Sequence, residues 1–128
     1  MGYLLDTHTV LWIFDEEEKL PKAAVRALRD TTKKVCVSII SAWELAIKIG
    51  TGKLAFNGGI ERFFRMIDDN GFGLLPVRRE HIVTLETLPL LHRDPFDRLL
   101  ISTAITENLT LITADENIHK YDVPWVWQ

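Results

Sequence analysis

Four acidic residues stand where their carboxylates could act together. They are Asp6, Glu44, Asp97 and Asp115. Asp6 directly follows an apolar run, Tyr3–Leu5, and Asp115 follows a second run, Leu109–Thr113, both typical of short buried strands. Glu44 and Asp97 lie in the first two turns of two expected helices. Because ligands of a parallel sheet bind beyond the carboxyl ends of its strands, we expect the four carboxylates to meet in one pocket.

Clustered carboxylates have a defined chemical use. They repel one another unless a cation lies between them, and their hard oxygen atoms suit Mg²⁺ or Mn²⁺, which keep several waters and contact phosphates. A bound ion can activate water and stabilise the leaving oxygen of a phosphodiester, and two ions can share these tasks. The pattern predicts metal-dependent phosphodiester hydrolysis, with Asp6, Glu44, Asp97 and Asp115 as the catalytic and metal-binding residues.

Each of these acids also has a simpler structural interpretation. Asp6 and Asp97 could each cap the N-terminus of a helix, and Asp115 could be a turn residue. Glu44 could pair with Lys48, one helical turn further on and in the favourable order. The structural interpretation explains Glu44 less well than it explains the three aspartates. Glu44 is the only acid on an apolar helical stretch, where an unpaired carboxylate is costly.

A further acid, Asp94, precedes Asp97 by one helical turn. Asp97 heads the apolar stripe that continues through Leu100 and Ala104, so its side chain should point along the core-facing side of the helix. Asp94 instead precedes a proline, which favours an extended backbone and a tight entry to the helix. We interpret Asp97 as a site residue and Asp94 as structural.

The elements that must position these acids alternate along the chain. The expected strands are Tyr3–Leu5, Val35–Val37, Phe72–Leu75, Leu109–Thr113 and Trp125–Trp127. The expected helices are Pro21–Arg29, Ser38–Gly50, Ile60–Asp69, Arg79–Leu88 and Asp97–Glu107. Strands separated by helices imply right-handed crossovers and a sheet covered on both faces. The predicted fold is α/β, a three-layer α/β/α sandwich with a mostly parallel sheet of about five strands, as a single domain over residues 1–128.

Composition narrows the class of protein. The 128 residues are 47% hydrophobic and 26% charged, which is typical of one soluble globular domain and excludes a disordered chain. No apolar run reaches the roughly 18 residues of a membrane helix, and no secretory signal is evident, so we expect a cytoplasmic protein without membrane contact. Cys36 is the only cysteine, which excludes an internal disulfide and a cysteine-based zinc site. The net charge of −3 argues against binding nucleic acid through an overall positive field, but a nuclease can take its positive charge from metal ions.

Basic and aromatic residues offer less specific patterns. The basic candidates for phosphate contact are Lys48, Arg93 and Arg98. His8 and His92 lie near the acids in sequence but show no metal-ligand spacing, so we expect them at the surface or in supporting roles. Tryptophans could stack on nucleic-acid bases, but we expect Trp43 in the core, and Trp125 and Trp127 over a sheet edge or a partner.

Four short segments carry a resemblance to a known family. They are Leu5–His8, Ser38–Leu45, Asp94–Leu100 and Leu111–Asp115. In this order and spacing they resemble the PIN-domain nucleases, and among them the VapC-type ribonuclease toxins of bacterial and archaeal toxin–antitoxin pairs. The resemblance spans essentially the whole chain and implies a five-stranded parallel sheet and Mg²⁺- or Mn²⁺-dependent RNA cleavage. It implies the same four acids, with helper hydroxyls on Thr7 and Thr113, while the additional acid Asp94 departs from the pattern.

The resulting hypothesis is a Mg²⁺-dependent endoribonuclease that is the toxin of a toxin–antitoxin pair. Its expected partners are an RNA substrate and a small cognate antitoxin protein, and a homodimer is an open alternative. One alternative function is a PIN-like RNA-processing or DNA nuclease that is not a toxin. Another is a non-catalytic regulator that keeps the acid pocket and binds RNA or a protein. Cleavage assays on RNA and DNA, with and without metal, separate these functions.

Overall fold

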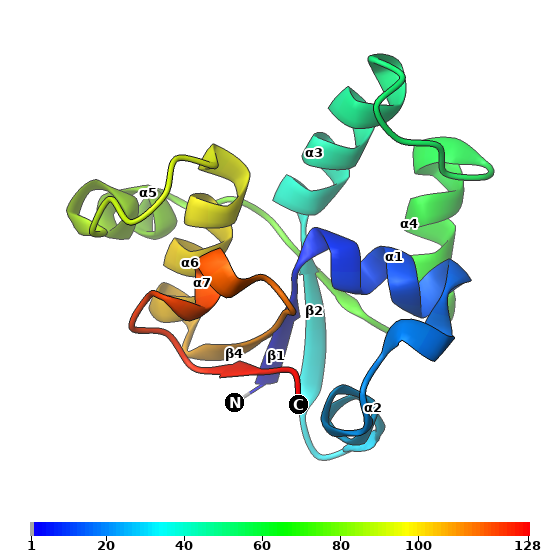
Figure 1. The fold of residues 1–128 in the computed structure, drawn as a ribbon, viewed down its shortest axis with the longest axis horizontal. Coiled ribbons are helices and arrows are strands. Elements are labelled where there is room, and N and C mark those ends of the chain that lie inside the picture. Colours follow the sequence, from blue (N-terminus) through cyan, green and yellow to red (C-terminus); the bar gives the residue numbers. More distant parts are fainter. Residues whose placement is uncertain (1) are drawn as a thin grey trace.

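A parallel sheet forms the centre of the protein (Figure 1). The computed structural model describes residues 2–128. The strands are β1 (Gly2–Leu5), β2 (Lys34–Ser38), β3 (Gly73–Leu75), β4 (Leu109–Ile112) and β5 (Trp125–Val126). They lie in the order β3-β2-β1-β4-β5, and each neighbouring pair is parallel. The prediction of a mostly parallel sheet of about five strands is confirmed.

Helices connect the strands and cover both faces of the sheet. They are α1 (Thr7–Asp15), α2 (Lys22–Arg29), α3 (Ile39–Gly50), α4 (Gly59–Asp69), α5 (Arg79–Thr87), α6 (Pro95–Glu107) and α7 (Glu116–His119), with a short 3-10 turn at Glu17–Lys19. Figure 1 shows α1, α2 and α4 on one side of the sheet and α5, α6 and α7 on the other. Among residues 2–128, no helix is both long enough and apolar enough to cross a membrane.

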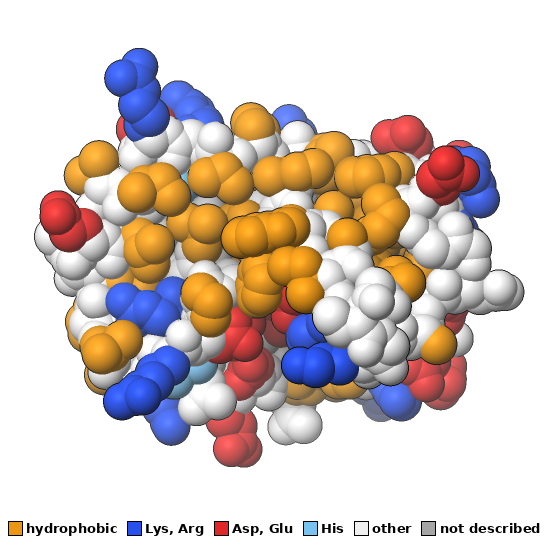
Figure 2. Space-filling view, turned by 90° about the horizontal axis from the view of Figure 1, so that it is seen from above, with side chains coloured by type: hydrophobic (Ala, Val, Ile, Leu, Met, Phe, Trp, Pro, Cys, Tyr) orange, Lys and Arg blue, Asp and Glu red, His pale blue; other side chains and the backbone are white. Residues whose placement is uncertain are grey.

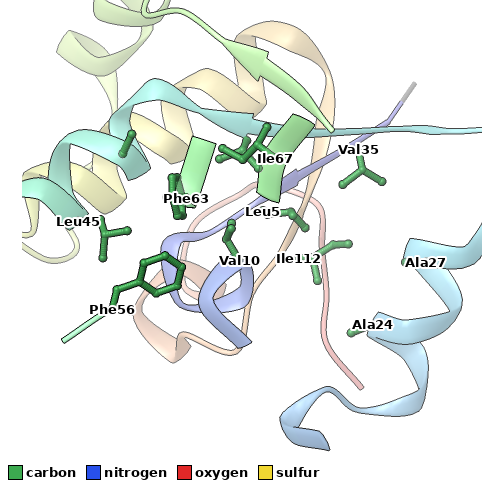
Figure 3. Close-up of a cluster of buried hydrophobic side chains, with 12 residues drawn as sticks. Leu5, Val10, Ala24, Ala27, Val35, Leu45, Phe56, Phe63, Ile67 and Ile112 are labelled. Atoms are coloured by element: carbon green, nitrogen blue, oxygen red, sulfur yellow. The ribbon is translucent and has the colours of Figure 1, made fainter. Parts of the chain in front are cut away.

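Alternate residues of the central strands face two separate hydrophobic clusters. Leu5 of β1 and Ile112 of β4 join the cluster that also holds Val10 of α1 (Figure 3). Their neighbours Leu4 and Leu111 join the cluster on the other face, with residues of α6 and α7. Because successive side chains of a strand point to opposite faces, this alternation shows that the sheet is buried on both sides. The predicted three-layer α/β/α sandwich is confirmed.

Polar side chains at the carboxyl edge of the sheet begin the helices that follow. Asp6 accepts a hydrogen bond from the Thr9 backbone N–H at 2.8 Å and thereby caps α1. Ser38, Asp94 and Asp115 cap α3, α6 and α7 in the same way. These caps satisfy N–H groups that have no partner inside a helix. As a result, the first turn of each of these helices lies at the carboxyl edge.

The structure differs from the sequence-based expectation at the start of α6, in the presence of α1 and α7, and at Trp43. Helix α6 begins at Pro95, because Asp94 caps it and proline suits the first helical position. From the sequence, a helix after Asp6 is only the alternative explanation of that residue, but α1 is present and Asp6 caps it. The sequence does not predict α7, which has only four residues. The expectation that Trp43 lies in the core is wrong. Its side chain lies on the outer side of α3, is 59% exposed, and meets the ring of Phe96 edge-on at 5.0 Å.

Candidate active site

Asp6 lies at the end of β1, the central strand of the sheet, and is 5% exposed. One carboxylate oxygen accepts the N–H of Thr9, and the other accepts the hydroxyl of Thr113, which follows β4. Burial raises the pKa of Asp6 above its ordinary value, and these hydrogen bonds oppose that rise. The Asp6 carboxylate is therefore held both by α1, through Thr9, and by the residue that follows β4, Thr113.

Glu44 lies in the second turn of α3 and is 4% exposed. The hydroxyl of Thr7, the first residue of α1, donates a hydrogen bond to Glu44 Oε1 at 2.7 Å. Lys48 Nζ lies 2.7 Å from Glu44 Oε2, so the alternative partner expected from the sequence is present. The acid is fixed by one neutral donor and one cation, and Lys48 brings a positive charge to the acid site.

Asp97 lies in the first turn of α6, and its side chain is 17% exposed. Its pKa is raised to about 8, first by burial and then by four neighbouring carboxylates. These are Asp94, Asp115, Glu44 and Asp6, in decreasing order of effect. The other three acids singled out in the sequence therefore all affect the Asp97 carboxyl electrostatically. Asp94 caps α6 by accepting the N–H groups of Phe96 and Asp97, as its structural interpretation requires, and it is also the carboxylate that most affects Asp97.

Asp115 caps the short helix α7 by accepting the N–H of Asn117 at 2.8 Å. Its own N–H donates to the hydroxyl oxygen of Thr113 at 3.0 Å. The fully buried Thr113 hydroxyl therefore connects two of the acids, because it accepts from the Asp115 backbone and donates to the Asp6 carboxylate. Thr7 and Thr113, the helper hydroxyls implied by the sequence resemblance, both contact an acid as expected.

Residues 3–124 match the family model described as PIN domain. The chain belongs to the PIN-domain family. The match covers nearly the whole chain and includes all four acids, so the family expected from the four sequence segments is confirmed. A comparison with curated protein sequences gives no match.

Solved structures share the fold of this PIN domain over almost its full length. A chain of the VapBC2 complex from Rickettsia felis, bound to a DNA fragment from their promoter, superposes with a TM-score of 0.76 at 18% identity, covering 100% of both chains. A chain of DNA-bound VapBC from Salmonella typhimurium gives 0.72 at 17% identity, covering 98% of this chain and 97% of that one. A chain of VapBC-5 from Mycobacterium tuberculosis, a member of the VapBC family of toxin–antitoxin systems, gives 0.67 at 16% identity, covering 99% and 98%.

His92 supports Asp97 in this PIN domain through a hydrogen-bond chain that fixes its tautomer. The oxygen of the Tyr121 hydroxyl accepts from Arg98 and from the backbone N–H groups of Leu91 and His92, at 3.0 to 3.3 Å. Since three donors already point at this oxygen, which has two lone pairs, a fourth donor at His92 Nδ1 is unfavourable, and we infer that the hydroxyl donates its own hydrogen to Nδ1, which lies 2.8 Å away. His92 Nδ1 is therefore the acceptor, and Nε2 carries the hydrogen that is donated to Asp97 Oδ2 at 3.2 Å.

The basic residues near the acids have different roles. Arg98 donates to the carbonyl oxygens of Pro89 and Leu88 and to Tyr121, so it holds the segment before α6. The phosphate contact suggested for Arg98 from the sequence stays a prediction. Lys48 is engaged with Glu44. The pKa of Lys48 is raised by its hydrogen bond to Glu44 and by further carboxylates that include Asp97. Lys48 therefore balances part of the negative charge of the acid site.

The donor chemistry of the site fits a divalent cation. The acids offer hard oxygen ligands, and their mutual repulsion is the property that a cation would relieve. His92 occupies Asp97 Oδ2 and leaves Oδ1 without a hydrogen bond within residues 2–128. In that part of the chain, no three His, Cys, Asp or Glu side chains are close enough to share one ion in this arrangement.

Sequence reasoning found the acids but missed the residues that hold Asp97. Tyr121 was not singled out, and His92 was assigned only a general supporting role. The signal that links them is weak, because Tyr121 is separated from His92 by 29 positions and approaches it only through the packing of α7 against α6. Figure 2 looks onto this carboxyl edge, where acidic side chains gather beside a broad band of hydrophobic side chains.

Proposed function

We propose that this PIN domain is a Mg²⁺- or Mn²⁺-dependent endoribonuclease and the toxin of a toxin–antitoxin pair. The observation that carries the nuclease proposal is the environment of Asp97, whose pKa is raised to about 8 by burial first, then by Asp94, and then by the site acids Asp115, Glu44 and Asp6. A structural carboxylate would gain a cation or several donors, whereas Asp97 gains four like charges. A domain that maintains this repulsion in a PIN fold is best explained by a cation held there for catalysis.

Asp6, Glu44, Asp97 and Asp115 would hold the metal. When bound, the metal would supply the charge that activates a water molecule and stabilises the leaving oxygen of the phosphodiester. The protein positions its acids with neutral donors, since Thr113 orients Asp6, Thr7 orients Glu44 and His92 orients Asp97. One of these carboxylates accepts a proton from the attacking water. The water oxygen bonds to phosphorus, the bond from phosphorus to the departing oxygen breaks, and that oxygen takes up a proton.

The toxin role is supported by the structures that share the fold. These structures are of VapBC complexes, one of them from the VapBC family of toxin–antitoxin systems. The acid site would also suit a protein segment that carries arginine or lysine, because such a side chain pairs with carboxylates. We propose that a small cognate antitoxin inhibits the enzyme in this way. RNA is the proposed substrate because the sequence segments resemble VapC-type ribonucleases.

The cleavage test uses matched single-stranded RNA and DNA, each with Mg²⁺ and with a chelator. We expect Mg²⁺-dependent cleavage of RNA, and a loss of at least about 100-fold for Asp97→Asn, which keeps the side chain's shape but removes its charge. Asp122→Asn, at an exposed position outside the site, is the matched control and should cleave as the wild type does. Cleavage of DNA alone would favour a DNA nuclease, and near-normal cleavage by folded Asp97→Asn would contradict the assignment of the site.

Expression in bacterial cells tests the toxin proposal separately. We expect the wild-type chain to arrest growth, Asp6→Asn to be harmless, and co-expression of the cognate antitoxin to restore growth. Harmless expression of soluble protein that cleaves RNA in vitro would contradict the toxin role and leave the nuclease intact.

A further inference from the structure

A cleft of about 350 Å³ lies at the outer end of the carboxyl edge, between α7 and β5. Its lining residues are Ala114, Glu116, His119, Trp125, Trp127 and Gln128. Ala114 stands between Thr113, which holds Asp6, and Asp115. The cleft therefore begins next to Asp115 and next to the threonine that holds Asp6. Figure 1 shows α7 and β5 next to β4 on this side of the molecule.

Aromatic rings form a firm wall of this cleft. The rings of His119 and Trp125 are stacked, with centroids 3.5 Å apart and planes inclined by 11°. His119 Nε2 donates to the carbonyl oxygen of Thr113 at 2.8 Å, so the imidazole is fixed to the residue that joins Asp6 and Asp115. Trp127 is held in turn by Trp12 of α1, with ring centroids 5.5 Å apart. The wall is thus built before any ligand arrives.

Trp125 is more exposed than we would expect of an indole that only covers a sheet edge. Its side chain is 42% exposed although one face is stacked on His119. An indole that served only to protect β5 would gain more stability by burying this apolar area. An open aromatic face at the edge of a nuclease site is a surface on which a base can stack, and such stacking does not require a particular base.

The charge of the lining favours a base over a phosphate. Glu116 is the only acidic side chain of the lining, no lysine or arginine lines the cleft, and Gln128 adds an amide. A carboxylate repels phosphate but accepts N–H groups, and guanine presents two adjacent N–H donors, N1–H and N2–H, on its Watson–Crick edge. Glu116 makes no ion pair within residues 2–128 that would compete for this role.

We propose that this cleft binds one nucleobase of the RNA strand, with the base stacked on Trp125 and a preference for guanine set by Glu116. The proposal rests on the proposed ribonuclease function and extends it, because it adds a recognition site to the acid site. A base seated here would place a neighbouring phosphodiester beside Asp115 and Asp6. Cleavage would then favour bonds at a fixed step from a guanine.

Binding is tested with catalytically inactive Asp97→Asn protein and short single-stranded RNA that contains one guanine, followed by fluorescence anisotropy. Adding Trp125→Leu, which keeps apolar volume but removes the ring, should weaken binding by about 5- to 150-fold, the range for one stacked base. Adding Trp125→Tyr restores a flat ring and should recover most of the affinity. Equal affinity for all three proteins would overturn the proposal.

A probe in the RNA tests stacking without any substitution in the cleft. 2-Aminopurine, placed at each position of the oligonucleotide in turn, should be quenched at a single position when the Asp97→Asn protein binds. This quenching should disappear with Trp125→Leu. Uniform fluorescence at every position, or quenching that survives Trp125→Leu, would overturn the proposal.

Glu116→Gln tests the base preference. The Asp97→Asn protein should bind the guanine-containing RNA about 10-fold more tightly than RNA with adenine, uracil or cytosine at that position, an energy difference within the range of a good base contact. Glu116→Gln should reduce this preference severalfold. Glu18→Gln removes an equally exposed charge from the 3-10 turn and should leave the preference unchanged. A preference that is insensitive to Glu116→Gln would overturn the role of Glu116.

These outcomes separate the base site from the nuclease proposal. RNA cleavage by Asp97→Asn would overturn the assigned acid site, whatever binds in the cleft. If Asp97→Asn is inactive and adding Trp125→Leu does not change its affinity for RNA, only the base site is overturned. If Trp125→Leu weakens binding of the antitoxin but leaves binding of RNA unchanged, the cleft receives a protein side chain, which also overturns the proposal.

Discussion

His92 Nε2 lies 3.2 Å from Asp97 Oδ2 and donates its hydrogen to that oxygen. We infer the tautomer of His92 from its contact with Tyr121. Three donors already point at the Tyr121 hydroxyl oxygen, so this hydroxyl donates its own hydrogen to His92 Nδ1. Asp97 is the carboxylate most affected by its acidic neighbours, and His92 holds one of its oxygens with a neutral donor. The other oxygen is left to face the acid site, where a cation would lie.

Replacing His92 should weaken metal binding without unfolding the protein. His92→Ala removes the donor, so Asp97 loses its fixed orientation, and Mn²⁺ affinity should fall by about 10- to 100-fold, as for other partners of metal ligands. His92→Gln keeps an N–H donor at a similar reach and should recover much of the loss. Calorimetric titration with Mn²⁺ measures this, and ¹⁵N NMR of the wild-type imidazole should report the Nε2–H tautomer. Equal affinities for the three proteins, or an Nδ1–H tautomer, would contradict the account.

The Thr113 hydroxyl should contribute more to the free energy of unfolding than an equally buried hydroxyl elsewhere. Thr113→Val leaves an Asp6 oxygen and the Asp115 N–H without a partner, and should cost about 1–3 kcal/mol in free energy of unfolding. Thr103→Val is the matched control, because that buried hydroxyl donates only to the Leu99 carbonyl within α6, and its loss should cost less than about 1 kcal/mol. Urea denaturation measures both, and equal losses would argue against the role of Thr113.

The Glu44–Lys48 pair should matter most when no metal is bound. Lys48→Met leaves the buried Glu44 carboxylate among other acids, and should cost about 1–3 kcal/mol in chelator. Lys19→Met breaks the exposed pair with Glu16 and should cost between about 0 and 1 kcal/mol. Saturating Mg²⁺ should reduce the cost of Lys48→Met only, since the ion supplies positive charge at the same place. A cost for Lys48→Met that Mg²⁺ leaves unchanged would contradict this prediction.

Stability of the metal-free protein should fall as pH rises from about 4 to about 8. The pKa of Asp97 is raised to about 8 in the folded protein from an ordinary value of 3.8, and the pKa of Asp6 is raised as well. The folded state therefore binds more protons than the unfolded state in this window, so each step up in pH removes stability. Thermal melts in chelator should show a drop of several degrees between about pH 5 and pH 8. Asp97→Asn should flatten this dependence, and an unchanged slope in that variant would refute its origin in Asp97.

Much of the fold could be predicted from the sequence because its signals are local. Short apolar runs gave β1, β2 and β4, and the caps Ser38 and Asp94 with Pro95 explain where α3 and α6 begin. The order of strands in the sheet depends on long-range packing and could not be derived from these local patterns. Trp43 was misplaced because an apolar helix such as α3 does not reveal from its sequence which side faces the core.

The candidate acids could be selected from the sequence, but the contacts that hold them could not. Asp6 and Asp115 were recognisable because each follows a strand, and the structure shows that each also caps a helix, so the two interpretations weighed for them are compatible. The environment of Asp97 depends on Tyr121, which approaches only through tertiary packing. Hydrogen-bond partners that are distant in sequence leave no periodic signal, which is why the support of Asp97 emerged only from the structure.

The central claim is that the four acids form one metal site, and paired thermal melts test it most directly. Wild-type protein and the variants Asp6→Asn, Glu44→Gln, Asp97→Asn and Asp115→Asn are melted in chelator and in Mg²⁺, with Asp122→Asn as the control. Mg²⁺ at about 100 times its Kd should stabilise the wild type by roughly 2.7 kcal/mol, a rise on the order of 10 °C for a domain of this size. Above about pH 8, where Asp97 is ionised, each site variant should melt no lower than the wild type in chelator, because one repulsive charge is gone, and should lose most of the rise. The control should keep the full rise. A wild type that ignores Mg²⁺, together with site variants that all melt lower in chelator, would show that these acids are structural caps and ion-pair partners and would contradict the account.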